Sequence, residues 1–230
     1  MEFRDRTVVV TGGTGALGTV VVGELLAAGA RCRIPYVLQK EADAFPYKDS
    51  VELVPDCDLT DESAVARLYE GFQGKLYASI HIAGGFAMSN LADTDKQGLM
   101  AMLNANLISC HLCSRAALHA FGADGGRIVN VAARKALEPQ YGAGMSAYVV
   151  SKAAVAALTQ ALAAEVASKN VLVNAVAPSI IDTPANRAAM PGAAHDTWPT
   201  PREIASTILF LASPRNRVTS GAVVPVYGRA

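Results

Sequence analysis

The sequence predicts a doubly wound (Rossmann) α/β fold, a mostly parallel sheet with helices on both faces. Short β-branched runs alternate with helical patterns along the chain. The runs are almost continuously apolar, which is typical of strands buried on both faces of a parallel sheet. Right-handed crossovers between such strands place helices on both sides. We expect strands at seven runs: 7–12, 30–37, 51–58, 76–84, 126–132, 171–178 and 222–227.

The helical segments between these runs differ in how much of their surface is apolar. The pattern over 16–28 places one apolar stripe toward a sheet, and Gly29 suits its C-terminal cap. The segments 99–121 and 146–167 are rich in Ala, Leu and Val beyond one narrow stripe. A second apolar face indicates contact with another copy, so we expect a homodimer or homotetramer.

Nothing in the chain marks a division into separate units. No linker, low-complexity tract or internal repeat appears, so we expect one domain over 1–230. The longest segment without clear periodicity is 183–201. Loops of this kind lie over the carboxyl ends of the strands, where ligands bind in this architecture. We interpret 183–201 as a lid on the substrate side.

Composition restricts the class of partner. Twenty basic residues balance twenty acidic ones, so no overall field favours nucleic acid or an anionic membrane surface. The apolar run near the N-terminus is too short for a signal peptide or a membrane span, and we expect a cytoplasmic protein with a small-molecule substrate.

Four cysteines in 230 residues do not form a disulfide framework. Cys110 and Cys113 form a CxxC inside an apolar helical pattern, which favours core packing over a metal site, and no metal is expected.

The first turn carries the strongest signal for a ligand. Gly13, Gly15 and Gly18 form a GxGxxG that follows a predicted strand and opens a helix. Glycine allows the backbone to approach a pyrophosphate, whose charge meets the free amides and positive end of the helix dipole. The alternative is a plain tight turn. We expect a dinucleotide, bound by Thr11, Gly12, Gly13, Gly15, Ala16, Leu17 and Gly18.

The end of the second strand bears on the choice between NAD and NADP. A cofactor without a 2′-phosphate is held there by an acidic residue. Tyr36 occupies that position, and the first acidic residue beyond it is Glu41. NADP (NADPH) is therefore favoured over NAD, with Arg33 or Lys40 as candidate phosphate partners.

Tyr148 and Lys152 stand four residues apart in a helical pattern, so their side chains share one helix face. By itself this pair favours the simpler interpretation, an amphipathic tyrosine and an extended lysine on a solvated helix face. The remaining motifs decide between the two interpretations.

Six stretches, "TGGTGALG", "CDLTD", "HIAGG", "NANL", "YVVSK" and "VNAVAPSIIDTP", together resemble the short-chain dehydrogenase/reductase family along nearly the whole chain. The resemblance implies a sheet of seven parallel strands and assigns Tyr148, Lys152 and Asn106 to the catalytic machinery. It also implies cofactor contacts from a further set of residues: Tyr36, Asp58, Leu59, Ala83, Gly84, Gly85, Tyr148, Lys152, Pro178, Ile180 and Thr183.

The chemistry of the pair agrees with that assignment. Tyrosine and lysine titrate near ~10 and ~10.4, so both need tuning at neutral pH. We expect the neighbouring ammonium group, with an oxidised nicotinamide, to lower the pKa of Tyr148. Tyr148 then donates or accepts the proton as hydride moves. Lys152 holds ribose hydroxyls, and Asn106 supports a water chain to it; the alternative for Asn106 is a locally bonded helix residue.

One position departs from the family pattern. The family carries a serine after the fifth strand, where this chain has Ala133. Losing one such donor costs on the order of a hundredfold to a thousandfold in turnover, so an ordinary ketone should react slowly. Ser146 is a conceivable substitute, but its place at a helix start predicts a cap. Trp198 either stacks on a planar substrate or anchors the loop.

Dihydropteridine reductase, a branch that lacks that serine, resembles this chain in "ARKAL", in "DTPANRAAMP" and in the following Trp198. That branch prefers NADH and lacks the counterpart of Asn106, so the match is partial. Three hypotheses follow: reduction of an activated conjugated acceptor such as a quinonoid pteridine or quinone, reduction of small carbonyls or oxidation of alcohols, and a non-catalytic NADP-binding sensor.

Overall fold

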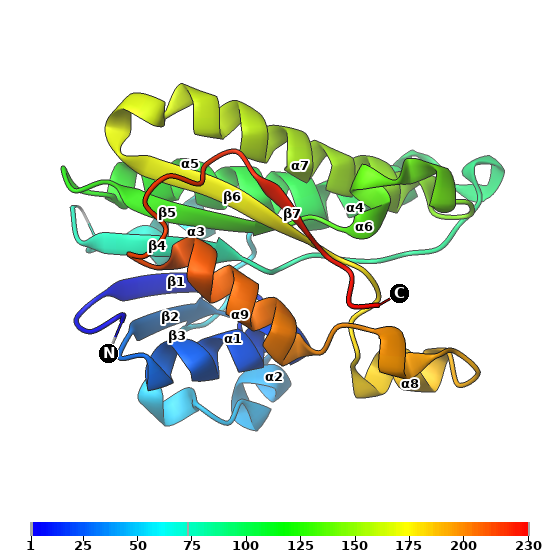
Figure 1. Cartoon of the computed structure of the whole chain (residues 1–230), viewed down its shortest axis with the longest axis horizontal. Coiled ribbons are helices and arrows are strands. Elements are labelled where there is room, and N and C mark those ends of the chain that lie inside the picture. Colours follow the sequence, from blue (N-terminus) through cyan, green and yellow to red (C-terminus); the bar gives the residue numbers. More distant parts are fainter. Residues whose placement is uncertain (1, 73, 230) are drawn as a thin grey trace.

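The computed structural model describes residues 2–72 and 74–229, and its centre is one sheet of seven strands. The strand order is β3-β2-β1-β4-β5-β6-β7, and every pairing is parallel (Figure 1). All seven expected strands are present, although the third is much shorter than expected. Their bounds are β1 (Thr7–Thr11), β2 (Arg31–Pro35), β3 (Glu52–Val54), β4 (Leu76–His81), β5 (Gly126–Val131), β6 (Val171–Pro178) and β7 (Val223–Val226).

Helices cover both faces of the sheet, which confirms the doubly wound α/β fold (Figure 1). The strand order reverses between β1 and β4, the point at which ligands bind in such sheets. On one face lie α1 (Ala16–Ala27) and α9 (Pro201–Ala212), and on the other α3 (Glu62–Tyr69), α5 (Ser109–Ala120) and α7 (Ser146–Glu165). The remaining helices are α2 (Gln39–Ala44), α4 (Lys96–Leu103), α6 (Arg134–Leu137) and α8 (Pro184–Ala189).

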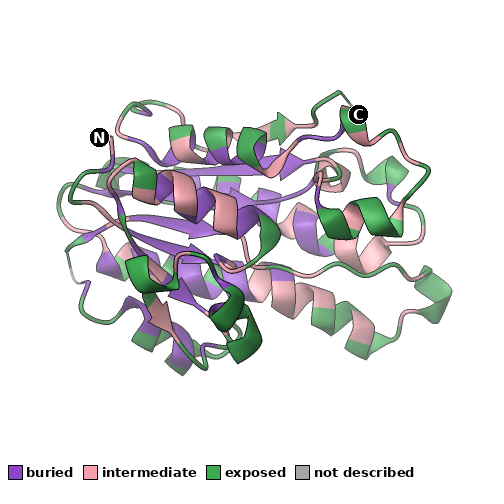
Figure 2. Cartoon of the chain, turned by 90° about the horizontal axis from the view of Figure 1, so that it is seen from below, coloured by how far each residue is buried: buried purple, intermediate pink, exposed green. Residues whose placement is uncertain are grey.

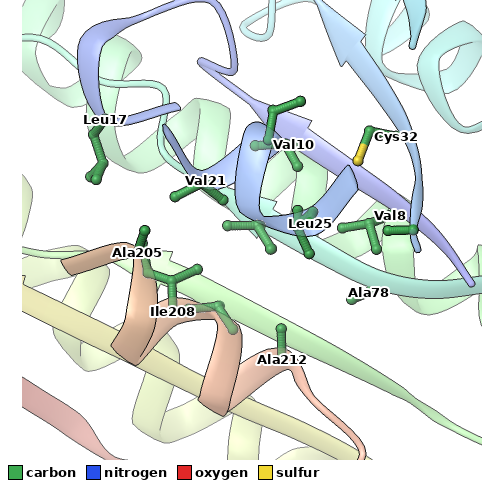
Figure 3. Packing of buried hydrophobic residues seen from close by; sticks show 14 of the residues in the cluster. Val8, Val10, Leu17, Val21, Leu25, Cys32, Ala78, Ala205, Ile208 and Ala212 are labelled. Atoms are coloured by element: carbon green, nitrogen blue, oxygen red, sulfur yellow. The ribbon is translucent and has the colours of Figure 1, made fainter. Parts of the chain in front are cut away.

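The alternation of side chains along β1 divides the core into two layers. Val8 and Val10 point toward α1 and α9, whereas Val9 packs with the opposite helices. Leu17, Val21 and Leu25 of α1 lie toward Ala205, Ile208 and Ala212 of α9 (Figure 3). The strands are largely buried and the outer helix faces exposed (Figure 2). The stripe predicted for the first helix therefore faces the core.

A chain of buried polar side chains crosses the second layer. His81 Nδ1 lies 2.8 Å from Asn130 Oδ1, and His81 Nε2 lies 2.8 Å from Ser79 Oγ. Tyr69 Oη is 2.6 Å from Ser79 Oγ, and Asn130 Nδ2 donates to Thr159 Oγ1 over 2.9 Å. Burial lowers the pKa of His81 to about 4. The network therefore joins α3, β4, β5 and α7 around a neutral imidazole that donates from Nδ1 and accepts at Nε2.

Two helices differ in extent or continuity from the segments expected for them. The segment expected as one helix over 99–121 comprises α4, the π-helical turn η3 (Asn104–Ile108) and α5. A π turn contains an extra residue, which shifts the face that the side chains occupy, and such turns are frequent at functional sites. The helix expected over 146–167 ends at Glu165. Within residues 2–72 and 74–229, this helix, α7, is the one long and apolar enough to cross a membrane, but its buried face packs in the core.

The four cysteines are buried and unpaired. Cys110 and Cys113 lie in α5, where burial raises the pKa of Cys110 to about 12 and raises that of Cys113 further. Both thiols are therefore held in the protonated form and pack in the core, as the apolar pattern around the CxxC predicts.

Candidate active site

The glycine turn brings the start of α1 against the end of β4. Gly12 has a φ of +66°, and a Cβ there would lie 2.7 Å from Ala83 N. A Cβ on Gly18 would lie 2.0 Å from Gly12 O, so the first turn of α1 packs directly on the loop. A Cβ on Gly13 would lie 2.6 Å from Ile34 Cγ2. Side chains at these three positions would displace the turn, which explains the glycines there.

Gly15 differs from the other glycines of the turn. It is exposed, and a Cβ there would meet only Gly12 O, at 3.4 Å. Gly15 is the N-cap residue of α1, and within the described residues no side chain caps this end of the helix. The first amides of α1 have no partner within the helix, so they are available to an anion. The turn therefore fits a pyrophosphate group, with Gly15 and Ala16 at the exposed surface.

Arg33 and Lys40, the two candidate partners of a 2′-phosphate, differ in how far their side chains are free to bind a ligand. Arg33 donates through Nη1 to Leu68 O (2.9 Å) and Glu70 O (2.8 Å), and through Nε to Glu52 (2.8 Å). Its guanidinium also lies 3.9 Å from the centroid of the Phe72 ring. The candidate role of Arg33 as a phosphate partner is therefore wrong, because Nε and Nη1 are committed to the protein and its side chain is only 14% exposed. Lys40 is exposed in α2, at the same end of β2 as Tyr36.

Tyr36 and Asp58 are neighbours at the carboxyl edge of the sheet. Cys57 N donates to Tyr36 O over 3.1 Å, which places Asp58 and Leu59 beside the end of β2. Tyr36 Oη donates to Gln39 Oε1 over 3.0 Å. Asp58 is exposed and accepts from Thr60 N over 2.8 Å. These residues occupy the edge at which the resemblance places an adenosine.

The segment after β4 follows the same edge. Thr11 O accepts from Ile82 N (3.1 Å), and Thr11 Oγ1 accepts from Ala83 N (3.3 Å). Gly84 is exposed, and a Cβ on it would lie 2.5 Å from Asn106 Oδ1 and 3.2 Å from Lys152 Nζ. Only glycine at this position leaves room for both side chains, so the backbone there forms part of the site.

Asn106 is the point where three segments meet. Its Oδ1 accepts from Gly85 N (3.0 Å), and its Nδ2 donates to Gly85 O (3.0 Å) and Ser151 Oγ (3.0 Å). Ser151 Oγ donates in turn to Tyr148 O over 2.7 Å. The alternative of a locally bonded helix residue is therefore wrong. The side chain is 1% exposed and connects the loop after β4 to α7.

Lys152 is the buried cation of the site. It is 6% exposed, and its Nζ donates to Val131 O at the end of β5 over 2.8 Å. Burial lowers the pKa of Lys152 to about 8. The solvated-face interpretation is wrong for this residue because its side chain is buried. Among the described residues the ammonium group has one hydrogen-bond partner, which leaves two of its three N–H donors for a ligand. Those donors suit ribose hydroxyls, the role that the resemblance implies.

Tyr148 is partly buried against an aromatic wall. The Phe86 ring packs edge-on against it, with centroids 4.9 Å apart and an interplanar angle of 81°. Burial raises the pKa of Tyr148 to about 12. The expected lowering of the pKa by Lys152 is therefore wrong for the protein chain by itself, where burial removes hydration from the phenolate and raises the pKa. The phenol is held in its proton-donating form.

Ala133 and Ser146 are the two positions that bear on whether the site has a second hydrogen-bond donor beside Tyr148. Ala133 is 6% exposed and caps α6 at the end of β5, where the family serine would stand. Ser146 is not a helix cap, because Met145 holds the N-cap position and Ser146 begins α7. Its Oγ is buried and has no hydrogen-bond partner among the residues that the structure describes. The expectation of a capping serine is wrong, since that hydroxyl bonds to no backbone amide of its own helix.

The residues after β6 end beside the substrate side of the site. Pro178 closes β6, Ile180 is 40% exposed, and Thr183 is the N-cap of α8, accepting from Asn186 N over 3.2 Å. The segment 183–201 is not structureless, since it contains α8 and the 3₁₀ turn His195–Thr197. It is tied to the chain end where Arg229 N donates to Thr197 O over 2.8 Å.

Trp198 anchors this segment. It is 7% exposed, and its ring centroid lies 4.7 Å from that of His195. A ring so buried offers no open face to a substrate, so its candidate role in stacking is wrong. Phe86, which sequence reasoning missed, is 60% exposed beside Tyr148. Its position directly after "HIAGG" is the only sequence signal for it.

Fold and site together define a Rossmann-type oxidoreductase, because the glycine turn fits a dinucleotide, and the partly buried Tyr148 and the buried Lys152 lie on the same edge of the sheet. The chain matches the family model described as Enoyl-(Acyl carrier protein) reductase over residues 14–228. It is 30% identical over 239 residues to 3-oxoacyl-(acyl-carrier-protein) reductase MabA of Mycobacterium tuberculosis, covering 98% of this chain and 93% of the relative. This protein belongs to the short-chain dehydrogenase/reductase family.

Further similarities agree with the family. Galactitol 2-dehydrogenase of Rhizobium johnstonii is 35% identical over 247 residues, covering 95% of this chain and 92% of the relative. The solved structure described as ElxO with NADP bound has a TM-score of 0.88 at 26% identity, covering 97% of each chain. A short-chain type dehydrogenase/reductase from Mycobacterium ulcerans has a TM-score of 0.86 at 25% identity, covering 100% of this chain and 90% of that chain.

Proposed function

We propose that this protein is an NADPH-dependent reductase of activated, conjugated acceptors such as quinonoid pteridines or quinones. The observation that carries the proposal is the pairing of a protonated Tyr148 with Ala133, which cannot donate a hydrogen bond. An isolated carbonyl depends on two donors for polarisation, and losing one costs about a hundredfold or more in turnover. A conjugated acceptor takes up hydride with less polarisation.

The chain's own residues have distinct roles in this reaction. A bound reduced nicotinamide would supply the hydride. Tyr148, with its pKa raised by burial to about 12, donates the proton to the acceptor heteroatom. Lys152 orients the cofactor ribose through its two free donors. Asn106 is a positioning residue, because it holds the loop after β4 against the helix that carries Tyr148.

The acceptor's rings have a surface to lie against. Phe86 exposes 60% of its area while one edge contacts Tyr148. Aromatic pairs favour offset or edge-to-face geometry, so a planar acceptor beside Phe86 would present its edge to the phenol. This supports a conjugated ring system over a small aliphatic ketone.

The preference for NADPH rests on the end of β2. Tyr36 stands where an acidic residue would repel a 2′-phosphate, and the exposed Lys40 lies near it. The structure of ElxO with NADP bound shows that a fold of this kind accommodates that cofactor. Titration should give a lower Kd for NADPH than for NADH, and Lys40→Gln should reduce the difference; equal affinities would reject the preference.

The experiment that tests the substrate class compares the protein with its Ala133→Ser variant. Steady-state rates are measured with a panel of simple ketones and with quinonoid pteridine and quinone acceptors. We expect the variant to gain at least tenfold in kcat/KM on ketones and to change little on the conjugated acceptors. A wild-type rate on ketones that equals the rate on conjugated acceptors would overturn the proposal.

A specific observation favours a second candidate, the reduction of small carbonyls or oxidation of alcohols. Ser146 Oγ is buried without a partner, two residues before Tyr148 in α7. A rotation of this hydroxyl toward the substrate would replace the missing donor. Ser146→Ala should then reduce turnover of ketones by about a hundredfold, whereas the first candidate predicts no such loss.

A non-catalytic NADP-binding sensor is the third possibility. Tyr148, Lys152 and Asn106 argue against it, because a binding protein has no need of a buried phenol beside a buried amine. Tyr148→Phe should abolish hydride transfer while leaving NADPH binding intact, and Tyr141→Phe, at an exposed tyrosine, is the matched control. Absence of turnover with every acceptor in the wild type would favour the sensor.

We also propose a cytoplasmic homodimer or homotetramer that acts on small molecules. Leu99 and Met100 of α4 and Val150 of α7 are 36%, 39% and 54% exposed, so these helices retain apolar surface for a second copy. Light scattering coupled to gel filtration measures the assembly. A monomer at micromolar concentration would reject this part of the proposal.

A further inference from the structure

A cavity of about 660 Å³ lies at the amino ends of the parallel strands, whereas Tyr148 lies at their carboxyl ends. Its walls come from the segments at the amino ends of five strands, β1, β4, β5, β6 and β7. Substrate and cofactor residues lie at the carboxyl ends of the same strands. The cavity is therefore separated from the proposed active site by the length of the sheet. Its volume lies within the range of small-molecule sites.

Four basic side chains line this cavity: Arg6, Lys75, Arg127 and Arg217. The lining contains two carboxylates, Asp5 and Asp124, so positive charge is in excess. Within residues 2–72 and 74–229, none of the four cations takes part in a salt bridge. By contrast, nearby Arg215 is paired with Glu2 at 2.8 Å. Unpaired cations around one concave surface attract an anion.

Two residues of the inner wall, Arg127 and Tyr77, come from neighbouring strands. Arg127 donates through Nη1 to Gly126 O (3.0 Å) and through Nη2 to Asn216 O (3.2 Å), which fixes the position of its guanidinium group. Arg6 stacks on the Tyr77 ring, with its guanidinium carbon 3.9 Å from the ring centroid.

Arg6 and Arg127 thus share one aromatic side chain as neighbour. Burial lowers the pKa of Arg127, and the charge of Arg6 acts in the same direction although Tyr77 opposes it. Like charges that line one cavity repel each other, and a bound anion would offset that repulsion.

We propose that this cavity binds a phosphate-bearing small anion. Guanidinium groups match phosphate oxygens in a two-pronged geometry, and Lys75 and Arg217 add charge at the exposed rim. The volume and the spread of four cations over four segments suit more than one phosphate group. The ligand class is therefore a di- or polyphosphate, bound at a second site independent of hydride transfer.

Calorimetric titration with pyrophosphate tests this site. The glycine turn is itself expected to bind a pyrophosphate group, so titrations are done with and without saturating NADPH. We expect one pyrophosphate site to persist when NADPH is present. Tripolyphosphate and ATP are further arms that measure the preferred length and source of the phosphate chain. Citrate measures whether carboxylates suffice, and binding of citrate as tight as that of pyrophosphate would overturn the phosphate assignment.

Variants of the lining cations test whether pyrophosphate binds in this cavity. Arg127→Gln should abolish binding, but it alters a partly buried side chain and its folding must be checked by thermal melting. The double variant Lys75→Gln, Arg217→Gln alters only exposed residues and should weaken pyrophosphate at least tenfold. The matched control Lys48→Gln, Lys96→Gln removes the same charge from exposed positions outside the cavity. Equal binding in the two double variants, or no pyrophosphate site beside NADPH, would overturn the proposal.

Discussion

The side-chain amide of Asn106 donates to Ser151 Oγ over 3.0 Å, and this hydrogen bond joins the π turn η3 to the helix that carries Tyr148. The same side chain exchanges two hydrogen bonds with the backbone of Gly85. One residue therefore fixes the loop after β4, the π turn and α7 relative to one another. Its role is to position the groups that act on the substrate.

Asn106→Ala should remove this link. The backbone groups of Gly85 lose their partner in a partly buried place, so unfolding free energy should fall by about 1–3 kcal/mol. We also expect kcat to fall more than KM changes, because the phenol and the cofactor loop lose their fixed relation. Urea denaturation and steady-state kinetics measure both effects.

The control for that experiment lies in the same turn. Asn104 begins η3, and its side chain makes no hydrogen bond within the described part of the chain. Asn104→Ala should leave both quantities nearly unchanged. Equal losses in the two variants would show that the π turn tolerates no substitution and that Asn106 has no special role.

Gly15 and Gly18 should respond differently to alanine. A Cβ on Gly18 would lie 2.0 Å from Gly12 O, so Gly18→Ala should displace the turn and lower the melting temperature. A Cβ on Gly15 has its nearest contact at 3.4 Å, so Gly15→Ala should fold normally. Its methyl group would occupy the approach of the pyrophosphate, and NADPH affinity should fall at least tenfold. Normal NADPH binding by Gly15→Ala would contradict the assigned cofactor position.

Affinity for NADPH should weaken as pH rises through about 8. Burial lowers the pKa of Lys152 to about 8, so its ammonium group loses a proton near that pH. Tyr148 has a pKa of about 12 and stays protonated over this range. Fluorescence titration between pH 7 and pH 10 measures the change, and Lys152→Met should remove it. The same decline in Lys152→Met would assign the pH dependence to another group.

Stability should fall as pH decreases from about 6.5 to about 4. Burial lowers the pKa of His81 from 6.5 to about 4, so in this interval the unfolded chain binds a proton that the folded chain does not. The difference of about 2.5 pKa units corresponds to about 3 kcal/mol of unfolding free energy, present above pH 6.5 and lost toward pH 4. Denaturation across this pH range measures the slope.

A direct measurement separates His81 from the carboxylates that also titrate in acid. The imidazole ring signals of His81 in an NMR titration should show protonation near pH 4 at Nε2, which then can no longer accept from Ser79, while Nδ1 continues to donate to Asn130. Protonation of His81 near its ordinary value of 6.5 in the folded protein would contradict the buried neutral network.

Local patterns were sufficient to predict most of the fold. Apolar runs with β-branched residues located all seven strands, because burial on both faces of a parallel sheet requires continuous apolar sequence. The π turn at Asn104–Ile108 was not predicted, since its helical pattern differs from an α-helix by a single residue. The α8 helix within the lid was also missed, because six residues are too few to show a period.

The site was only partly predictable for a related reason. Tyr148, Lys152 and the glycine turn have fixed spacings along the chain, so the sequence located them. Arg33 and Trp198 are chemically suited to a ligand, but the structure commits the first to Glu52 and the second to the core. Which side chains remain free depends on neighbours that are distant in sequence.

The sequence by itself determined the fold class, the dinucleotide turn, the Tyr148 and Lys152 pair and the alanine at 133, because periodicity and spacing are local properties of a chain. Only the tertiary structure decided the protonation states of Tyr148 and His81 and the contacts of Asn106. It also gathered, at the opposite edge of the sheet, four basic side chains that form no salt bridge within the described part of the chain. Burial and through-space charge control these properties, and both arise from segments that meet only when the chain folds.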